Sequence, residues 1–399
     1  MREYPPIGTR YLNLPPRFAM ADGSTLENAR MAYETWGQLS SRRDNAILLL
    51  GGLSVSAHAA SNDADPSSGW WEGMLGPGRS IDTNEWHVIC ANSLGSCKGS
   101  TGPASCDPGT GSPYGMNFPE LAIEDIADAI AFLVGKLGIT KLACVIGVSM
   151  GGMVALSLLS RHPTLSDNHI SISSAASANP FAIALRSLQR EIIRADPLWD
   201  NGSYDDEGYP RHGMVSARKL GLISYRSGLE WRTRFGRKKC DQSGNSEQSS
   251  FRPDFEIESY LDAKASPFPD TYDANSYLYL SRCIDRFDLG DRYAGNAEEA
   301  LARMPLTGCL VLGVETDILF PLDQQREIAD GLSKGGAEVE FEALESNLGH
   351  DAFLVDIDSF GSPISKFLNR LKHYAEETIR DHSRPTRSIE PKYGEQCRA

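Results

Sequence analysis

The chain has 399 residues, 41% of them hydrophobic and 23% charged, a composition typical of a globular protein with one large core. Its formal net charge of -14 at pH 7 argues against nucleic acid as a partner, because a polyanion would be repelled. The N-terminal residues MREYPPIGTR lack the apolar core of a signal peptide and no uncharged apolar run is long enough to span a bilayer, so we expect a cytoplasmic protein without a membrane partner.

Short apolar runs bounded by glycine predict the strands of a sheet. The first 40 residues indicate antiparallel strands at the edge of this sheet. Five later runs predict further strands: NAILLLGG (45–52), EWHVICANS (85–93), KLACVIGVS (141–149), TGCLVLGVET (307–316) and AEVEFEAL (337–344). Four of the five are continuous enough to be buried on both faces, which is typical of a mostly parallel sheet.

Runs of helical period separate these strands. In PELAIEDIADAIAFLVGKLGI (119–139) the isoleucines and leucines recur on one face, and Gly138 is placed to end the helix. A second helix follows the third strand at once and ends before Pro163. The alternation of strand and helix predicts an α/β fold with right-handed crossovers and helices flanking the sheet.

A long polar segment interrupts the alternation. Residues 180–295 are rich in arginine and tryptophan, and we interpret them as an inserted, mainly helical lid subdomain between two parts of the core, 1–179 and 296–380. Within the lid, KKCDQSGNSEQSSF (238–251) has no periodicity and predicts a mobile loop. Residues 381–399 are expected to form a disordered tail.

The residues Gly147-Val148-Ser149-Met150-Gly151 match the pattern GxSxG. Alone the pattern is weak, but here it follows a predicted buried strand and opens a predicted helix. That context is the nucleophile elbow of an α/β-hydrolase fold, in which a tight turn projects the serine hydroxyl. Ser149 is therefore predicted to be a nucleophile rather than a surface turn residue.

A nucleophilic serine needs a histidine base and an acid that orients it. In this fold the acid follows one late strand and the histidine follows the next. Asp317 and His350 occupy these places in the sequence. Asp323, interpreted as a helix cap, and Asp351, too close in sequence to orient His350, are the alternative acids.

An oxyanion hole is expected beside this triad. In this fold it combines the backbone N–H of the residue after the serine with one from the loop after an early strand. Met150 and Leu53 have these positions. A purely structural role for Leu53, as a buried apolar residue, fits the sequence equally well.

The sequence indicates neither a metal nor a bound redox cofactor. The eight cysteines form no CxxC pair, and no GxGxxG follows a strand. Reduced thiols are expected, with Cys144 and Cys309 buried in strands.

Six long stretches of the chain are together far more specific than GxSxG. They are GWWEGMLGPGRSIDT (69–83), NSLGSCKGSTGPASCDPGTGSPYG (92–115), GVSMGGM (147–153), FEIESYLDAKASPF (255–268), YDANSYL (272–278) and LGHDAFLVD (348–356). In these stretches the chain resembles the homoserine O-acetyltransferase group and its serine O-succinyltransferase relatives among the α/β hydrolases. The resemblance covers most of residues 45–370.

The resemblance implies acyl transfer from an acyl-CoA to an amino-acid hydroxyl through an acyl-serine, as in cysteine or methionine biosynthesis. By analogy, Arg218, Tyr225 and Asp351 hold the acceptor's carboxylate and amine. A guanidinium forks onto a carboxylate and an aspartate pairs with an ammonium, which suits these assignments. Pairing of Arg218 with a surface acid is the alternative. A homodimer joined through the inserted helices is also implied.

Positive charge near the lid suits a CoA donor. Residues 182–239 contain twelve Lys and Arg against seven Asp and Glu, and such a patch would attract the CoA phosphates. The residues that bind CoA are not identified by any motif. Succinyl selectivity would need an added cation near the acyl end, for which Arg186 and Arg190 are candidates without a motif.

Two departures from the usual homoserine acetyltransferase pattern favour the serine O-succinyltransferase branch. They are GGLSVSAHAASNDADPSSGWW (51–71) and NSLGSCKGS (92–100). We therefore favour L-serine and succinyl-CoA over L-homoserine and acetyl-CoA. The two acceptors differ by one methylene group, which allows a pocket to discriminate between them by only about 1 to 3 kcal/mol. A serine hydrolase, with water as the second nucleophile, and a non-enzymatic scaffold remain the alternatives.

Overall fold

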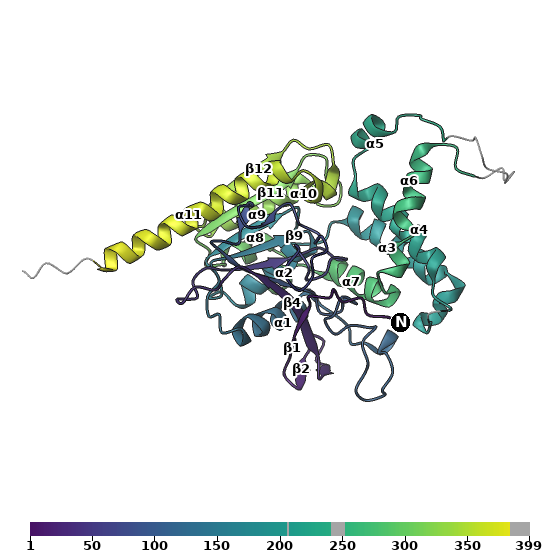
Figure 1. The fold of residues 1–399 in the computed structure, drawn as a ribbon, viewed down its shortest axis with the longest axis horizontal. Coiled ribbons are helices and arrows are strands. Elements are labelled where there is room, and N and C mark those ends of the chain that lie inside the picture. The colour runs from purple at the N-terminus through teal and green to yellow at the C-terminus, as the bar shows by residue number, and fades with distance from the viewer. Residues whose placement is uncertain (206, 241–251, 384–399) are drawn as a thin grey trace, which may run out of the picture.

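The computed structural model describes residues 1–205, 207–240 and 252–383, with side chains as far as residue 372. Eight strands form the central sheet in the order β1-β4-β8-β5-β9-β10-β11-β12 (Figure 1). In chain order they are β1 (Arg10–Asn13), β4 (Arg30–Trp36), β5 (Ala46–Leu50), β8 (His87–Ala91), β9 (Cys144–Val148), β10 (Asn168–Ile172), β11 (Gly308–Val314) and β12 (Glu338–Leu344).

The sheet is mostly parallel, as predicted. All pairs from β8 through β12 are parallel, while β1 and β4 pair antiparallel at one edge. The expectation for the first 40 residues is confirmed for these two strands. It is wrong for β2 (Arg17–Ala19) and β3 (Thr25–Glu27), which form a separate hairpin. A further small sheet joins β6 (Leu75–Gly76) to β7 (Ile81–Asp82).

The five predicted parallel strands are present, but the sequence reasoning missed β10. Its residues NHISI alternate polar with apolar side chains, so no continuous apolar run marks a buried strand. The strand nevertheless lies between β9 and β11 in the sheet. Its buried His169 is accommodated by a 2.9 Å hydrogen bond from Nδ1 to the carbonyl oxygen of Val145. Burial lowers the pKa of His169 to about 4, so this core histidine is neutral.

Helices cover both faces of the sheet. Successive residues of β5 point to opposite sides, so that Leu48 packs with the cluster on one face and Ile47 and Leu49 pack with the cluster on the other. The flanking helices are α1 (Ile123–Lys136), α2 (Met150–Arg161), α8 (Ala297–Ala302), α9 (Leu322–Lys334), α10 (Ala352–Val355) and α11 (Ile357–Ser383). The two helices predicted before and after β9 are thus confirmed as α1 and α2.

Five further helices lie between β10 and β11, within the segment interpreted as a lid. They are α3 (Pro180–Ala195), α4 (Arg211–Tyr225), α5 (Gly228–Arg234), α6 (Glu256–Ala265) and α7 (Ala274–Arg286). In Figure 1, α3 to α6 stand to one side of the sheet. Capping side chains start α3 and α7: Asn179 accepts from the N–H of Ala182, and Asp273 from the N–H of Ser276, each at 2.8 Å.

The two segments expected to be mobile fall largely outside the described residues. For the predicted loop 238–251 these are residues 241–251, and for the tail they are residues 384–399. The tail was predicted to start at residue 381, whereas α11 continues to Ser383. Within the described part of the chain, the helices are too short or too polar to cross a membrane.

Candidate active site

Ser149 occupies a strained turn between β9 and α2. Its backbone has φ 55° and ψ -124°. Residues other than glycine rarely adopt this conformation. The N–H of Ser149 donates to the carbonyl of Ile172 at 2.9 Å, and its own carbonyl accepts from the Ser174 hydroxyl at 2.9 Å. These bonds hold the turn in the conformation that presents the hydroxyl.

Glycines on both sides of Ser149 are required by close backbone contacts. A Cβ at Gly147 would lie 2.6 Å from the carbonyl oxygen of Gly151, and a Cβ at Gly151 would overlap the carbonyl of Leu50. The GxSxG pattern therefore reflects how tightly α2 returns against β9 and β5.

His350 bridges Ser149 and Asp317. The Ser149 hydroxyl donates to Nε2 of His350 at 2.9 Å, and Nδ1 of His350 donates to Oδ2 of Asp317 at 2.7 Å. The other carboxylate oxygen of Asp317 accepts from the N–H groups of Leu319 and Phe320 at 2.9 and 3.0 Å. With Nδ1 protonated toward the carboxylate, Nε2 is free to accept the serine proton.

The three side chains meet because their strands run parallel in one part of the sheet, where β10 separates β9 from β11. Ser149 follows β9, Asp317 follows β11 and His350 follows β12, so all three lie at the carboxyl end of the sheet. Of the alternative acids, Asp323 lies in the first turn of α9 and accepts the N–H of Gln324. Pro321 holds the cap position, so the interpretation of Asp323 as the cap is wrong.

Opposing effects set the protonation of His350. Burial alone would lower the pKa of its imidazole, but the charge of Asp317 and the hydrogen bond to it outweigh burial and raise the pKa above the usual value. Phe320 packs against the ring at 5.0 Å between centroids. The site thus holds a histidine with increased basicity in a water-poor setting.

The loop after β5 lies against the nucleophile. A Cβ at Gly52 would stand 3.9 Å from the Ser149 hydroxyl oxygen, and the next residue, Leu53, lines the same cavity as Ser149. The carbonyl of Leu53 accepts from the Tyr272 hydroxyl at 2.9 Å. Met150 is the first residue of α2. Both predicted oxyanion-hole residues therefore belong to segments that contact Ser149.

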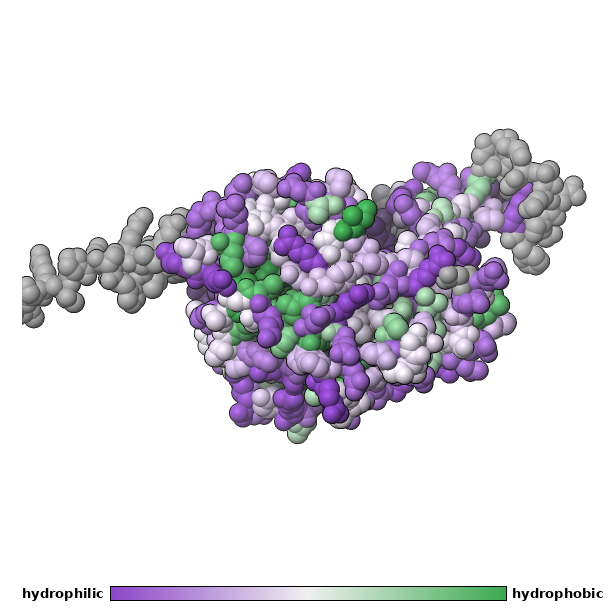
Figure 2. Space-filling model, turned by 60° about the horizontal axis from the view of Figure 1, so that its bottom comes forward, coloured by the Kyte–Doolittle hydropathy of each residue, from purple (hydrophilic) through white to green (hydrophobic). Residues whose placement is uncertain are grey.

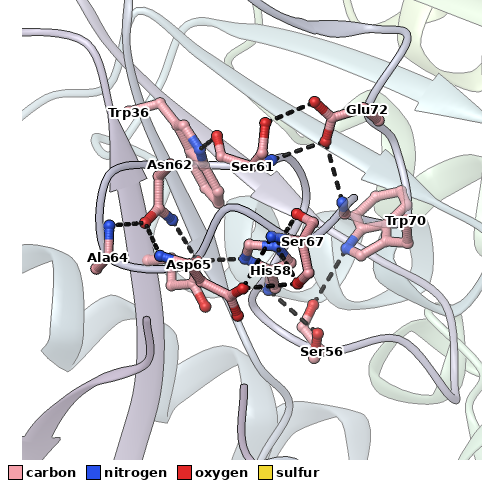
Figure 3. Close-up of polar contacts among 12 residues, drawn as sticks. Trp36, Ser56, His58, Ser61, Asn62, Ala64, Asp65, Ser67, Trp70 and Glu72 are labelled. Carbon is pink, nitrogen blue, oxygen red and sulfur yellow. Dashed lines mark hydrogen bonds and ion pairs between the residues drawn. The ribbon is translucent and has the colours of Figure 1, made fainter. Parts of the chain in front are cut away.

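A buried polar network braces this loop (Figure 3). His58 Nδ1 lies 2.8 Å from the carboxylate of Glu34, and its Nε2 lies 2.9 Å from the carbonyl of Ser67. The indole of Trp70 donates to the carbonyl of Ser56 at 3.1 Å. Burial lowers the pKa of His58, but the bonds to Glu34 and Ser67 and the charge of Glu34 outweigh it, so the pKa is raised. His58 supports the loop rather than joining the triad.

The predicted acceptor residues surround the same region. Tyr225 lines the cavity with Ser149 and His350. The guanidinium of Arg218 stacks over Phe268 and Tyr225, 4.7 and 5.7 Å from the ring centroids. Among the described residues Arg218 has no carboxylate within salt-bridge distance, so the alternative of a surface ion pair is wrong there.

Asp351 is already paired. Its Oδ2 accepts from Nε of Arg226 at 3.2 Å, and Arg226 also reaches Glu230 at 3.3 Å. Burial raises the pKa of Asp351, while the positive charges of Arg226, His350 and Arg218 partly offset this rise. Sequence reasoning missed Arg226, although it directly follows Tyr225.

A cluster of two arginines and one acid lies on the α3 side of the cavity. Arg186 and Arg190 both pair with Asp285 of α7. Arg186 lines the cavity with Ser149, and within the described structure its Nη2 has no hydrogen-bond partner. Gln189 and Tyr277 complete this wall. The sequence analysis assigned a site role to neither, although Tyr277 lies within the stretch YDANSYL (272–278).

The comparisons with known proteins identify the family to which this fold belongs. A model of the alpha/beta hydrolase fold family matches residues 45–357. An L-serine/homoserine O-acetyltransferase of Streptomyces lavendulae is 59% identical over 370 residues, covering 92% of this chain and 99% of that protein. A serine O-succinyltransferase of Stenotrophomonas maltophilia strain K279a is 54% identical over 371 residues, covering 93% and 100%.

Solved structures show the same architecture. A homoserine O-acetyltransferase from Bacillus anthracis has a TM-score of 0.82 at 29% identity and covers 90% of this chain and 97% of its own. Esterase E22 has a TM-score of 0.80 at 28% identity and covers 90% and 99%. With its parallel sheet, its strained elbow and relatives that match nearly end to end, the chain belongs to the α/β-hydrolase family, in the O-acyltransferase group that those relatives represent.

Proposed function

We propose that the chain is an acyl-CoA-dependent O-acyltransferase in which Ser149 is the nucleophile, His350 the general base and acid, and Asp317 the residue that orients His350. The observation that carries this proposal is the hydrogen-bonded chain from Ser149 through His350 to Asp317 at a cavity lined by lid residues. A serine hydroxyl is unreactive at neutral pH unless such a base accepts its proton.

The reaction runs in two half-reactions. Ser149 Oγ attacks the thioester carbonyl while its proton moves to Nε2 of His350, and the backbone N–H groups of Met150 and Leu53 stabilise the oxyanion. The C–S bond breaks and His350 returns the proton to the leaving CoA thiolate. The acceptor hydroxyl then attacks the acyl-serine, gives its proton to His350, and Ser149 leaves with that proton.

The acceptor is held at both ends of its amino-acid group. Arg218 binds the carboxylate, since its guanidinium has no carboxylate partner among the described residues. Asp351 binds the ammonium and shares its charge with Arg226. Tyr225 closes the site beside His350. These roles place the acceptor hydroxyl toward Nε2 of His350.

For the substrates we favour L-serine and succinyl-CoA. Two arginines share one aspartate beside Ser149, which leaves a positive charge for the terminal carboxylate of a succinyl group. The relative named serine O-succinyltransferase supports this choice. The relative named L-serine/homoserine O-acetyltransferase keeps L-homoserine and acetyl-CoA as the alternative pair, and the esterase neighbour keeps hydrolysis as a second function.

A thiol-release assay tests the proposal. Acetyl-CoA and succinyl-CoA are each supplied with L-serine, L-homoserine or no acceptor, and the product is identified by mass. Rapid release that requires an acceptor supports the transferase and identifies its substrates. Equal release without an acceptor would instead identify water as the second nucleophile.

The role of Arg218 has its own test. Arg218→Lys keeps the charge but removes the bidentate fork, so KM for the acceptor should rise about tenfold while KM for the donor stays unchanged. The matched control is Arg211→Lys on the same helix, where the arginine pairs with the exposed Asp270. An acceptor KM that is unchanged in Arg218→Lys would remove Arg218 from the site.

We also propose that residues 180–295 act as a lid and carry the interface of a cytoplasmic homodimer. Exposed apolar side chains on lid helices support an interface: Phe181, Leu188 and Ile223 are 54%, 46% and 48% exposed. The seven cysteines in the described residues are free, as in a reducing compartment. Light scattering should give twice the chain mass of 43.6 kDa. A mass equal to one chain would exclude the dimer.

A further inference from the structure

A cleft of about 470 Å3 is lined by residues of α3 and α7, the two helices that also contribute to the active-site cavity. We propose that this cleft binds the nucleotide end of the acyl-CoA donor, a 3′-phosphorylated adenosine diphosphate. The inference rests on the proposed function and deepens it, because it assigns a place to the part of the donor that takes no part in the chemistry.

The cleft and the active-site cavity share two walls. On α3, Arg186 and Gln189 line the cavity, while Arg190 and Arg194 line the cleft. On α7, Tyr277 lines the cavity and its neighbours Leu278 and Tyr279 line the cleft. The two spaces are therefore neighbours along the same pair of helices.

The separation suits the length of the donor. Arg186, Arg190 and Arg194 follow one another at intervals of four residues on α3, so they form one stripe that extends about 12 Å from the cavity into the cleft at 1.5 Å per residue. An extended pantetheine arm, which separates the thioester from the nucleotide in CoA, spans this distance.

Size excludes the nucleotide from the cavity beside Ser149. That cavity has a volume of about 50 Å3, enough for a few small groups only. The cleft, at about 470 Å3, falls within the range of roughly 300 to 1,000 Å3 that small-molecule sites occupy.

The residues of the cleft have the chemistry that a nucleotide diphosphate needs. Arg190, Arg194 and Arg282 face one acid, Glu120, among its lining residues, so the cleft is positive in a chain of net charge -14. Guanidinium groups bind phosphates through paired N–H donors. Local positive charge is needed here because the chain as a whole repels an anionic donor.

Two of these arginines are available for a phosphate. Within the described part of the chain, Arg194 has no carboxylate partner and stacks on Trp199, 5.6 Å from the ring centroid. Arg282 pairs with Glu120 at 3.0 Å, but both side chains are largely exposed, at 64% and 45%, so the pair is weak and can be exchanged for a phosphate.

Aromatic side chains in the cleft suit the adenine ring. The indole N–H of Trp199 donates to Asn275 at 3.0 Å and fixes the ring. The hydroxyl of Tyr279 donates to the carbonyl of Phe118 at 2.7 Å. Trp199 is only 7% exposed and carries Arg194 on its ring, so the partly exposed ring of Tyr279 is the face that can stack on a nucleobase.

The experiment compares two donors that carry the same acyl thioester. Succinyl-CoA has the nucleotide, and S-succinyl-N-acetylcysteamine lacks it. In the double variant Arg194→Gln/Arg282→Gln, KM for succinyl-CoA should rise about tenfold or more, as expected for lost charge-assisted bonds. KM for the truncated thioester should stay unchanged. The control Arg303→Gln/Arg370→Gln makes the same charge change at two exposed ion pairs elsewhere.

Three results would overturn the inference: equal changes for both donors, no change for either, or an altered oligomeric mass, which would make the cleft an interface between copies. If the double variant does not fold, a competition assay on the wild-type protein tests the inference. Adenosine 3′,5′-bisphosphate should compete with succinyl-CoA, and absence of competition refutes the site. If wild-type protein uses neither the succinyl nor the corresponding acetyl thioesters, the proposed function fails instead.

Discussion

At the scale of single residues, reactivity depends on a few precisely oriented hydrogen bonds. One carboxylate oxygen of Asp317 accepts hydrogen bonds from two backbone N–H groups, and the other accepts a hydrogen bond from Nδ1 of His350. Its carboxylate is thereby held in one orientation, and it fixes the tautomer of His350 in turn. The activity of Ser149 is a property of this arrangement rather than of the serine itself.

Replacing the nucleophile provides the first prediction at this scale. Ser149→Ala should abolish acyl transfer and leave thermal stability within about 0.5 kcal/mol, because the hydroxyl lies in the cavity and fills no core space. The measurements are thiol release and a calorimetric Tm. Ser187→Ala is the control, since it makes the same change at an exposed serine of α3 whose hydroxyl bonds the carbonyl of Ala184. Turnover retained by Ser149→Ala would refute the mechanism.

The protonation of His350 predicts a pH profile. The base must be neutral to accept a proton, so kcat/KM should rise with pH and reach its midpoint above about 6.5, the ordinary histidine pKa. Asp317→Asn removes the charge that raises this pKa, so the His350 midpoint should fall, as followed by imidazole NMR. A midpoint that is unaffected by Asp317→Asn contradicts the pairing.

The same shift has a consequence for stability. Because the folded-state pKa of His350 lies above its unfolded value, protonated His350 contributes stability that is fully present below pH about 6.5. This contribution is lost as pH rises through the folded-state pKa. The conditions that favour catalysis thus cost some stability.

At the scale of elements, the segment proposed as a lid is hydrogen-bonded to the loop that carries His350. The hydroxyl of Ser227, which caps α5, donates to the carbonyl of Asn347, and Arg226 bonds Asp351. Gly349 permits this contact: its φ is +66°, and a Cβ there would lie 2.9 Å from the carbonyl oxygen of Tyr225. The acceptor site and the base therefore depend on one backbone contact.

Gly349→Ala tests this contact. The methyl group should push the His350 loop from the lid, lower kcat at least about tenfold and destabilise the fold by about 1 to 3 kcal/mol. Gly336→Ala is a matched control, because Gly336 also has positive φ, +96°, but nothing lies within 4 Å of its Cβ position. Similar activity losses in both variants would show that backbone strain alone, not the lid contact, is responsible.

At the scale of the whole molecule, the net charge and the local charge act in opposite directions. The chain carries -14, and hydrophilic side chains cover much of the face in Figure 2. The arginines along α3 and α7 form a positive region within this field. The proposed anionic donor would therefore meet local attraction at this cleft.

This opposition predicts the effect of salt. Raising NaCl from about 0.05 to about 0.5 M shortens the screening length well below 10 Å, so KM for succinyl-CoA should rise several-fold. KM for the zwitterionic acceptor should change little. Steady-state kinetics at constant pH measure both. A donor KM that falls with salt would mean that the net charge of -14 dominates.

The sequence by itself determined the alternation of strands and helices, the elbow at Ser149, and the chain positions of Asp317 and His350. These are local signals: apolar runs, helical periods and glycines where backbones touch. It did not reveal β10, because burial of its polar residues depends on partners such as Val145. Short strands with polar positions are recognised only when the sheet is assembled.

Only the tertiary structure decided which charged groups meet. Arg226 reaches Asp351 across 125 positions, and Asp285 joins two arginines about 95 to 99 positions away. The arginines of α3 line a cavity and a cleft because α7 packs beside α3 and contributes residues to both spaces. The charge of a side chain follows from its residue type, but its partner depends on the packing of distant elements. The reason is that electrostatic interactions act through space rather than along the chain.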